Sequence, residues 1–145
     1  MADISSHSTQ IQAPIEQVRE ILFNLESYPS WSSAIKTVEV LERDSSSRPT
    51  KLTLKVEAGV LKDRPTLVYD WSKAPDEISF SLEEADVMTQ MDGKYEIKDN
   101  GDDSVTVTYS LTTALTMPVP DLMRRKVEKT TIEQSLSELK QKLEG

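Results

Sequence analysis

DSVTVTYSLTTALT (residues 103–116) leads directly into MPVPDLMRRKVEKTTIEQSLSELKQKLEG (residues 117–145). In the first segment Val105, Val107 and Tyr109 alternate with threonines, and this period of two predicts a strand with one apolar face. In the second segment apolar residues recur at helical spacing over about six turns. An antiparallel sheet with one apolar face must bury that face against another layer. The two segments together therefore predict a sheet that is covered by one long C-terminal helix.

The same alternation recurs in earlier segments, which are separated by short polar turns. The clearest turn is DNGDD (99–103), where Gly101 can adopt a positive φ. Short links between strands indicate antiparallel hairpins. A polar segment with β-branched residues predicts one more strand at the start of the chain. We expect these further strands at residues 4–12, 36–42, 51–60, 66–72, 77–84 and 89–99.

Two features of the strand region need a separate interpretation. The charged segment GVLKDRP (59–65) predicts a solvated hairpin between two strands. Gly93 stands alone inside a strand, which indicates a bulge or a bend. A strongly curved sheet requires such a bend.

Two short helices are predicted between the first two strands. Residues 13–25 (APIEQVREILFNL) have apolar residues at helical spacing, and Pro14 suits a first turn, where its missing N–H is not needed. The segment PSWSSAI (29–35) predicts one or two further helical turns. Tyr28 and Trp31 are large aromatic residues for an exposed loop. We interpret both as core residues that close one end of the sheet, with direct ligand contact as the alternative.

The predicted fold class is α+β, in a single domain that spans residues 1–145. A seven-stranded curved antiparallel sheet wraps around the long C-terminal helix, and two short helices follow the first strand. A chain of 145 residues can bury a sizeable core without disulfides. Because a strongly curled sheet does not close tightly on a single helix, we expect a cavity between them.

The composition argues against several classes of function. The chain has 25 acidic and 17 basic residues and a net charge of −8, which repels nucleic-acid phosphates, so we expect no nucleic-acid partner. It has no cysteine, which excludes disulfides and thiolate metal sites and favours a reducing compartment, so we expect a cytoplasmic protein. We also expect no integral membrane association and no signal peptide, because no apolar run is long enough to span a membrane and MADISSHSTQ lacks an apolar core.

Five short segments, taken with the order of the elements, resemble the START-like or SRPBCC superfamily: APIEQVREIL (13–22), YPSW (28–31), MDGKYEI (91–97), VTYSL (107–111) and PVPDLMRR (118–125). The chain looks most similar to the actinobacterial branch that is labelled polyketide cyclase/dehydrase and lipid transport. The resemblance covers nearly the whole chain. It implies a helix-grip fold, in which a curved antiparallel sheet holds the C-terminal helix around an apolar cavity. It also implies functions that range from lipid binding to polyketide ring closure, so it narrows the fold more than the function.

Candidate catalytic and metal-binding residues are few, and we name no catalytic residue. His7 is the only histidine, and we interpret it as a solvated residue of the first strand; we predict no metal site and no cofactor. The acidic residues of the strands alternate with apolar neighbours, so the pattern places none of them in the interior. The cluster RRK (124–126) is interpreted as surface charge. Contact with a ligand carboxylate or an anionic lipid at the cavity mouth is the alternative.

The function that this fold favours is binding, and by extension transport, of a small hydrophobic ligand such as a lipid, a fatty acyl chain or a polyketide-like molecule. The three tyrosines in the predicted site keep a hydroxyl that could orient a ligand, although a core role is commoner for a buried tyrosine. The apolar faces of the strands and the start of the long helix supply the predicted ligand-binding residues: Leu54, Val56, Tyr69, Trp71, Phe80, Met91, Tyr95, Tyr109, Leu111, Leu122 and Met123.

Two other functions stay open at this stage. A polyketide cyclase or dehydratase requires a buried ionisable residue opposite the tyrosines, and because the pattern supplies none, we lean away from an enzyme. A non-enzymatic interaction module, such as the toxin-like role attached to some relatives, requires a filled core without a cavity. The sequence carries no prediction of oligomeric state.

Overall fold

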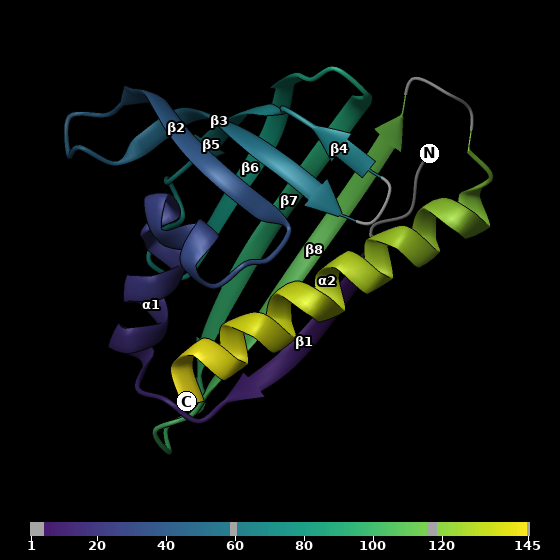
Figure 1. The fold of residues 1–145 in the computed structure, drawn as a ribbon. Helices are drawn as coiled ribbons and strands as arrows, with labels where there is room; N and C mark the ends of the chain where they lie inside the picture. Colours follow the sequence, from purple (N-terminus) through teal and green to yellow (C-terminus); the bar gives the residue numbers. More distant parts are fainter. Residues whose placement is uncertain (1–4, 59–60, 116–118, 145) are drawn as a thin grey trace.

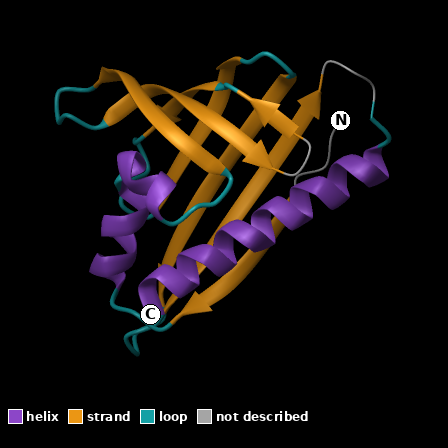
Figure 2. Ribbon diagram, viewed as in Figure 1, coloured by secondary structure: helices purple, strands orange, loops and turns teal. Residues whose placement is uncertain are grey.

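A computed structural model describes residues 5–58, 61–115 and 119–144, which form one curved sheet, one long helix and two short helices (Figures 1 and 2). The elements in chain order are β1 (Ser5–Ile11), α1 (Ile15–Phe23), the 3₁₀ helix η1 (Leu25–Ser30), β2 (Ile35–Arg43), β3 (Pro49–Ala58), β4 (Leu61–Asp63), β5 (Thr66–Asp70), β6 (Glu77–Glu84), β7 (Met88–Asp99), β8 (Val105–Leu115) and α2 (Asp121–Glu144).

The strands form one antiparallel sheet in the order β1-β8-β7-β6-β5-β3-β2, with β4 paired to the end of β3. Helix α2 packs against β1 and β8 and crosses the open side of the curved sheet (Figure 1). The predicted α+β helix-grip arrangement is confirmed, with the first strand, the short helices and the long C-terminal helix in the expected order. None of the helices in the described ranges is both long and apolar enough to cross a membrane.

The sheet has one short strand more than predicted, because β4 lies within the segment 59–65 that was expected to be a solvated hairpin. Asp63 is the physical reason for this difference. Its buried carboxylate accepts hydrogen bonds from the backbone N–H groups of Asp86 and Met88, each at 2.8 Å, and from that of Val87. The end of the hairpin is therefore held against the β6–β7 turn instead of extending into solvent.

The second short helix also lies earlier in the chain than predicted, since η1 begins at Leu25 and ends before Trp31. Both aromatic residues of this region are buried, as expected. The Tyr28 and Trp31 rings have their centroids 4.8 Å apart, and the Tyr28 hydroxyl donates a hydrogen bond of 2.6 Å to the carbonyl of Leu22. These contacts close one end of the curved sheet.

Gly93 is needed for close approach and does not mark a bulge. It pairs in regular register with Phe80 of β6 and Leu111 of β8, whereas the register shift of β7 lies between Met88 and Gln90. A Cβ atom at position 93 would overlap the Phe80 ring. The ring therefore lies directly over the glycine.

The two halves of α2 have different roles. Ile132, Leu136 and Leu139 in the C-terminal half are buried in the apolar core. The N-terminal half instead contributes Arg124 and Glu128 to the wall of a cavity. The core thus fills only part of the space between the helix and the sheet.

Candidate functional site

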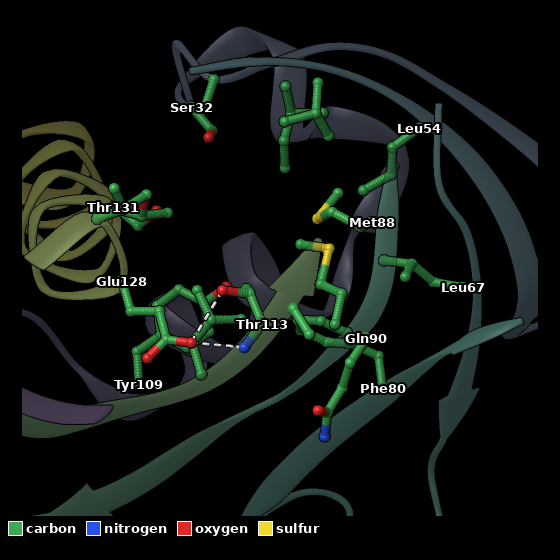
Figure 3. A pocket seen from close by; sticks show the side chains of 18 of the residues that line it. Ser32, Leu54, Leu67, Phe80, Met88, Gln90, Tyr109, Thr113, Glu128 and Thr131 are labelled. Carbon is green, nitrogen blue, oxygen red and sulfur yellow. Dashed lines mark hydrogen bonds between the residues drawn. The ribbon is translucent and has the colours of Figure 1, made fainter. Parts of the chain in front are cut away.

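A cavity of about 620 Å³ lies between the sheet and α2 (Figure 3). This volume falls within the range of roughly 300–1,000 Å³ that is typical of small-molecule sites. Side chains from η1, from strands β2, β3 and β5 to β8, and from α2 line it, and most of them are apolar. The sequence predicted a cavity at this place in the fold.

Eight of the eleven predicted ligand-binding residues line the cavity: Leu54, Val56, Tyr69, Phe80, Met91, Tyr95, Tyr109 and Leu111. All eight belong to strands, where the alternation of apolar and polar residues identifies the inward face. Their contact with a ligand stays a prediction.

The other three predicted residues lie away from the cavity. Trp71 comes after the last residue of β5, so the alternation of that strand no longer sets its direction; its ring packs on Phe23 and its Nε1–H donates a hydrogen bond of 2.6 Å to the carbonyl of Pro49. Leu122 and Met123 are 81% and 59% exposed. Successive residues of a helix are rotated by about 100°, and this rotation places both side chains on the side of α2 that is turned away from the sheet.

Arg124 and Glu128 occupy that inward face, and the sequence interpretation missed both. Glu128 is 0% exposed, although no acidic residue was expected in the interior, and Arg124 was interpreted as surface charge. A signal was available, because Glu128 precedes the buried Ile132 by one helical turn and follows Arg124 by another. Continuing the four-residue spacing of the buried helix face from Ile132 towards the N-terminus would have identified both residues.

The Glu128 carboxylate is satisfied by donors from three elements. Its Oε2 atom accepts hydrogen bonds from the Thr113 backbone N–H at 2.5 Å and from the Thr113 hydroxyl at 2.9 Å (Figure 3). It also accepts one from Arg124 Nη1 at 2.8 Å. Its Oε1 atom accepts one from the Ser5 hydroxyl at 2.7 Å. Such an arrangement stabilises the charged carboxylate and ties α2 to both β1 and β8.

All four tyrosines of the chain line the cavity, namely Tyr28, Tyr69, Tyr95 and Tyr109. Tyr95 and Tyr109 are directly paired in the sheet, and their rings stack with centroids 4.2 Å apart. Burial raises the pKa of every tyrosine above its ordinary value, and neighbouring tyrosines raise the pKa of Tyr28, Tyr69 and Tyr95 further. The four phenols therefore stay protonated, and each keeps an O–H group that is able to donate a hydrogen bond.

Metal ligands do not gather in this site. Within the described part of the chain, no three histidine, aspartate or glutamate side chains come close enough to hold an ion. His7 is half-buried on β1, opposite Tyr109 in the register, and is not part of the cavity wall.

A curved antiparallel sheet that holds a long C-terminal helix around an internal cavity defines a helix-grip protein of the START-like class. The sequence places the chain within this class: residues 11–140 match the profile of the polyketide cyclase/dehydrase and lipid transport family, and the chain belongs to that family. The resemblance noted from the sequence is thereby confirmed. A search of curated proteins found no match.

Solved structures support the same assignment. A START superfamily protein from Mycobacterium smegmatis is 26% identical, with a TM-score of 0.92 over 97% of each chain. The Zhui aromatase/cyclase from Streptomyces sp. R1128 is 17% identical, with a TM-score of 0.76 over 98% of this chain and 93% of that one. The ginseng major latex-like protein 151 from Panax ginseng is 10% identical, with a TM-score of 0.76 over 97% of each chain. The last two likenesses establish the fold alone.

Proposed function

We propose that the protein binds a small hydrophobic ligand, such as a lipid, a fatty acyl chain or a polyketide-like molecule, and can carry it in the cavity beneath α2. The observation that carries this proposal is the cavity of about 620 Å³, which has a mainly apolar wall. An interaction module with a filled core is disfavoured by the same volume. The adaptable side chains of Met88 and Met91 in the wall suit a ligand of variable shape.

The expected affinity follows from two opposing free energies. Burying about ten methylene groups contributes roughly 8 kcal/mol. Association costs roughly 4–15 kcal/mol in lost freedom of motion and ordering. A ligand held by apolar contacts alone should therefore bind with a dissociation constant nearer micromolar than nanomolar.

Native mass spectrometry of freshly purified protein, followed by solvent extraction, would identify any molecule that co-purifies.

In parallel, a fluorescent acyl-chain probe should bind at concentrations below about 100 μM, given the affinity expected above. Ala114 lines the cavity, so Ala114→Phe should fill part of it and weaken probe binding. Val68→Phe on the exposed face of β5 is the matched control and should leave binding unchanged. Absence of probe binding to the unmodified protein would overturn the proposal.

A ring-closing enzyme is the second candidate, because Glu128 supplies the buried ionisable residue that this hypothesis requires. Four donors inside the protein already occupy the oxygen atoms of its carboxylate, so binding without catalysis is the better-supported function. Incubating a linear poly-β-ketone with the protein and following the products by chromatography and mass spectrometry decides between them. Faster cyclisation that Glu128→Gln abolishes would establish the enzyme.

A further inference from the structure

The four cavity tyrosines differ in what their hydroxyls contact. The Tyr28 hydroxyl donates to the carbonyl of Leu22. The Ser135 side chain of α2 lies beside the Tyr95 hydroxyl and interacts with it. Both hydroxyls therefore have a polar neighbour in the fold itself.

The hydroxyls of Tyr69 and Tyr109 have no hydrogen-bond partner among the residues that the structure describes. Both side chains are almost fully buried, at 8% and 5% exposed, and both line the cavity. Neither hydroxyl oxygen is sealed off from the cavity space, so a ligand that cannot form hydrogen bonds would leave both without a partner, which is costly. A partner supplied by the contents of the cavity would remove that cost.

No charged residue in the described part of the chain contributes to the pKa of either hydroxyl. Burial raises both pKa values, and a neighbouring tyrosine raises that of Tyr69. Among the described lining residues, the charged pair Arg124 and Glu128 is anchored at Thr113. Thr113 is four residues beyond Tyr109, which is about 13 Å along β8.

We propose that the hydroxyls of Tyr69 and Tyr109 hold an uncharged oxygen acceptor, such as a ketone or ester carbonyl, on an otherwise apolar ligand. This inference deepens the proposed function and rests on it. A hydrocarbon leaves both hydroxyls unpaired, and a site built to pair with an oxygen discriminates against a ligand that lacks it. An ionised carboxylate loses its hydration at this position without gaining a cation.

Three ligands of equal carbon number test the inference on the unmodified protein: 2-undecanone, undecane and undecanoate. Each competes with a fluorescent apolar probe at about pH 8, where the carboxylate is ionised. One or two net hydrogen bonds predict that the ketone binds about three- to thirtyfold more tightly than undecane. We expect undecanoate to bind more weakly than the ketone.

Two variants locate the effect. Tyr69→Phe and Tyr109→Phe should each weaken ketone binding by about three- to tenfold and leave undecane binding unchanged. Because neither hydroxyl has a partner among the described residues, both variants should keep the thermal stability of the original chain. Thr108→Val removes a hydroxyl next to Tyr109 that bonds Ser8 and lies outside the cavity wall, so it should leave the ketone-to-undecane ratio unchanged.

The outcomes separate this inference from the proposed function. If undecane binds but the ketone binds no more tightly, or if undecanoate binds most tightly, the proposed role of the Tyr69 and Tyr109 hydroxyls is overturned. The proposal that the cavity binds a hydrophobic ligand then still stands. If none of the three displaces the probe and the probe itself does not bind, both proposals fail. The comparison of ligands uses the unmodified protein, so it decides the question even if a variant does not fold.

Discussion

Glu128 and Arg124 form an ion pair on the buried face of α2, where charged side chains are uncommon. Replacing a whole buried pair by apolar residues is often neutral, whereas removing one partner is costly, because the other charge stays in the interior. Here Glu128 also accepts hydrogen bonds from Thr113 and Ser5, so its loss leaves further polar groups without their acceptor. This residue joins the roof of the cavity to its wall.

We expect Glu128→Gln to lower the free energy of unfolding by about 3–5 kcal/mol, as measured by urea denaturation. The matched control is Glu133→Gln on the same helix, because Glu133 pairs with Lys129 at the exposed surface. An exposed pair of this spacing contributes only about 0.3–0.5 kcal/mol. Equal effects of the two substitutions would show that burial of the Glu128 pair does not matter.

Trp31 tests the packing at the closed end of the sheet. Its side chain is buried against Tyr28, so Trp31→Ala should cost about 3–5 kcal/mol in the free energy of unfolding. The thermal midpoint should fall accordingly, which differential scanning calorimetry measures. A decrease of only a degree or so would contradict the packing described for this residue.

The paired strands β6, β7 and β8 form one part of the sheet that lines the cavity. Phe80 lies over Gly93, and Leu111 stands on the other side of that glycine. The missing side chain at position 93 lets the Phe80 ring lie against the sheet and leaves the space beyond it open. The shape of the cavity therefore depends on one backbone position of a neighbouring strand.

Gly93→Ala should displace the Phe80 ring, lower the free energy of unfolding by about 1–3 kcal/mol and weaken binding of an apolar probe. Urea denaturation and a fluorescence titration measure the two effects. Gly101→Ala is the control: Gly101 has a φ of +85° in an open turn, so alanine there causes backbone strain but should not alter binding. If Gly93→Ala binds the probe as well as the original protein does, the contact between Phe80 and Gly93 does not determine the shape of the cavity.

At the scale of the whole molecule, helix α2 both contributes to the apolar core and covers the cavity. Its C-terminal half is packed through Ile132, Leu136 and Leu139, while its N-terminal half covers the cavity with polar residues on the inner face. The curved sheet brings tyrosines from η1, β5, β7 and β8 to that one cavity. Whether each tyrosine is protonated or ionised in alkaline solution therefore indicates whether the whole fold is intact.

We expect the protein to lose stability in alkaline solution. The pKa values of the four tyrosines are raised in the folded state, so below the ordinary value of 10.0 both states keep their phenolic protons. Above it the unfolded chain releases protons and the folded chain retains them. The free energy of unfolding should then fall as pH rises, by at most about 1.4 kcal/mol per pH unit and tyrosine.

An alkaline titration tests this prediction. Ultraviolet absorbance of tyrosinate measures the ionisation, and circular dichroism measures the loss of secondary structure in the same samples. Because all four tyrosines line the cavity, their ionisation should coincide with loss of secondary structure. A tyrosine that ionises near its ordinary pKa in the folded protein would show that its phenol is open to solvent.

Much of the fold was predictable from local patterns. The alternation in β3, β7 and β8 depends only on which side chains share a face of a strand, so the inward positions of Leu54, Tyr95 and Leu111 followed from it. The structure differs from the sequence prediction where that rule does not apply. Trp71 lies beyond a strand end, β4 is held by the contacts of Asp63 with a distant turn, and Leu122 and Met123 belong to a helix whose apolar stripe changes direction.

The sequence by itself determined the order of the elements, the apolar face of each strand and the family of the protein, because periodicity and short motifs are local properties of the chain. Only the tertiary structure decided that Glu128 is buried, that Tyr69 and Tyr109 keep their hydroxyls unpartnered within the described residues, and that space remains beneath α2. The physical reason is that burial and hydrogen-bond partners depend on the curvature of the sheet and the rotation of the helix upon it. Both are set by contacts between residues far apart in the chain.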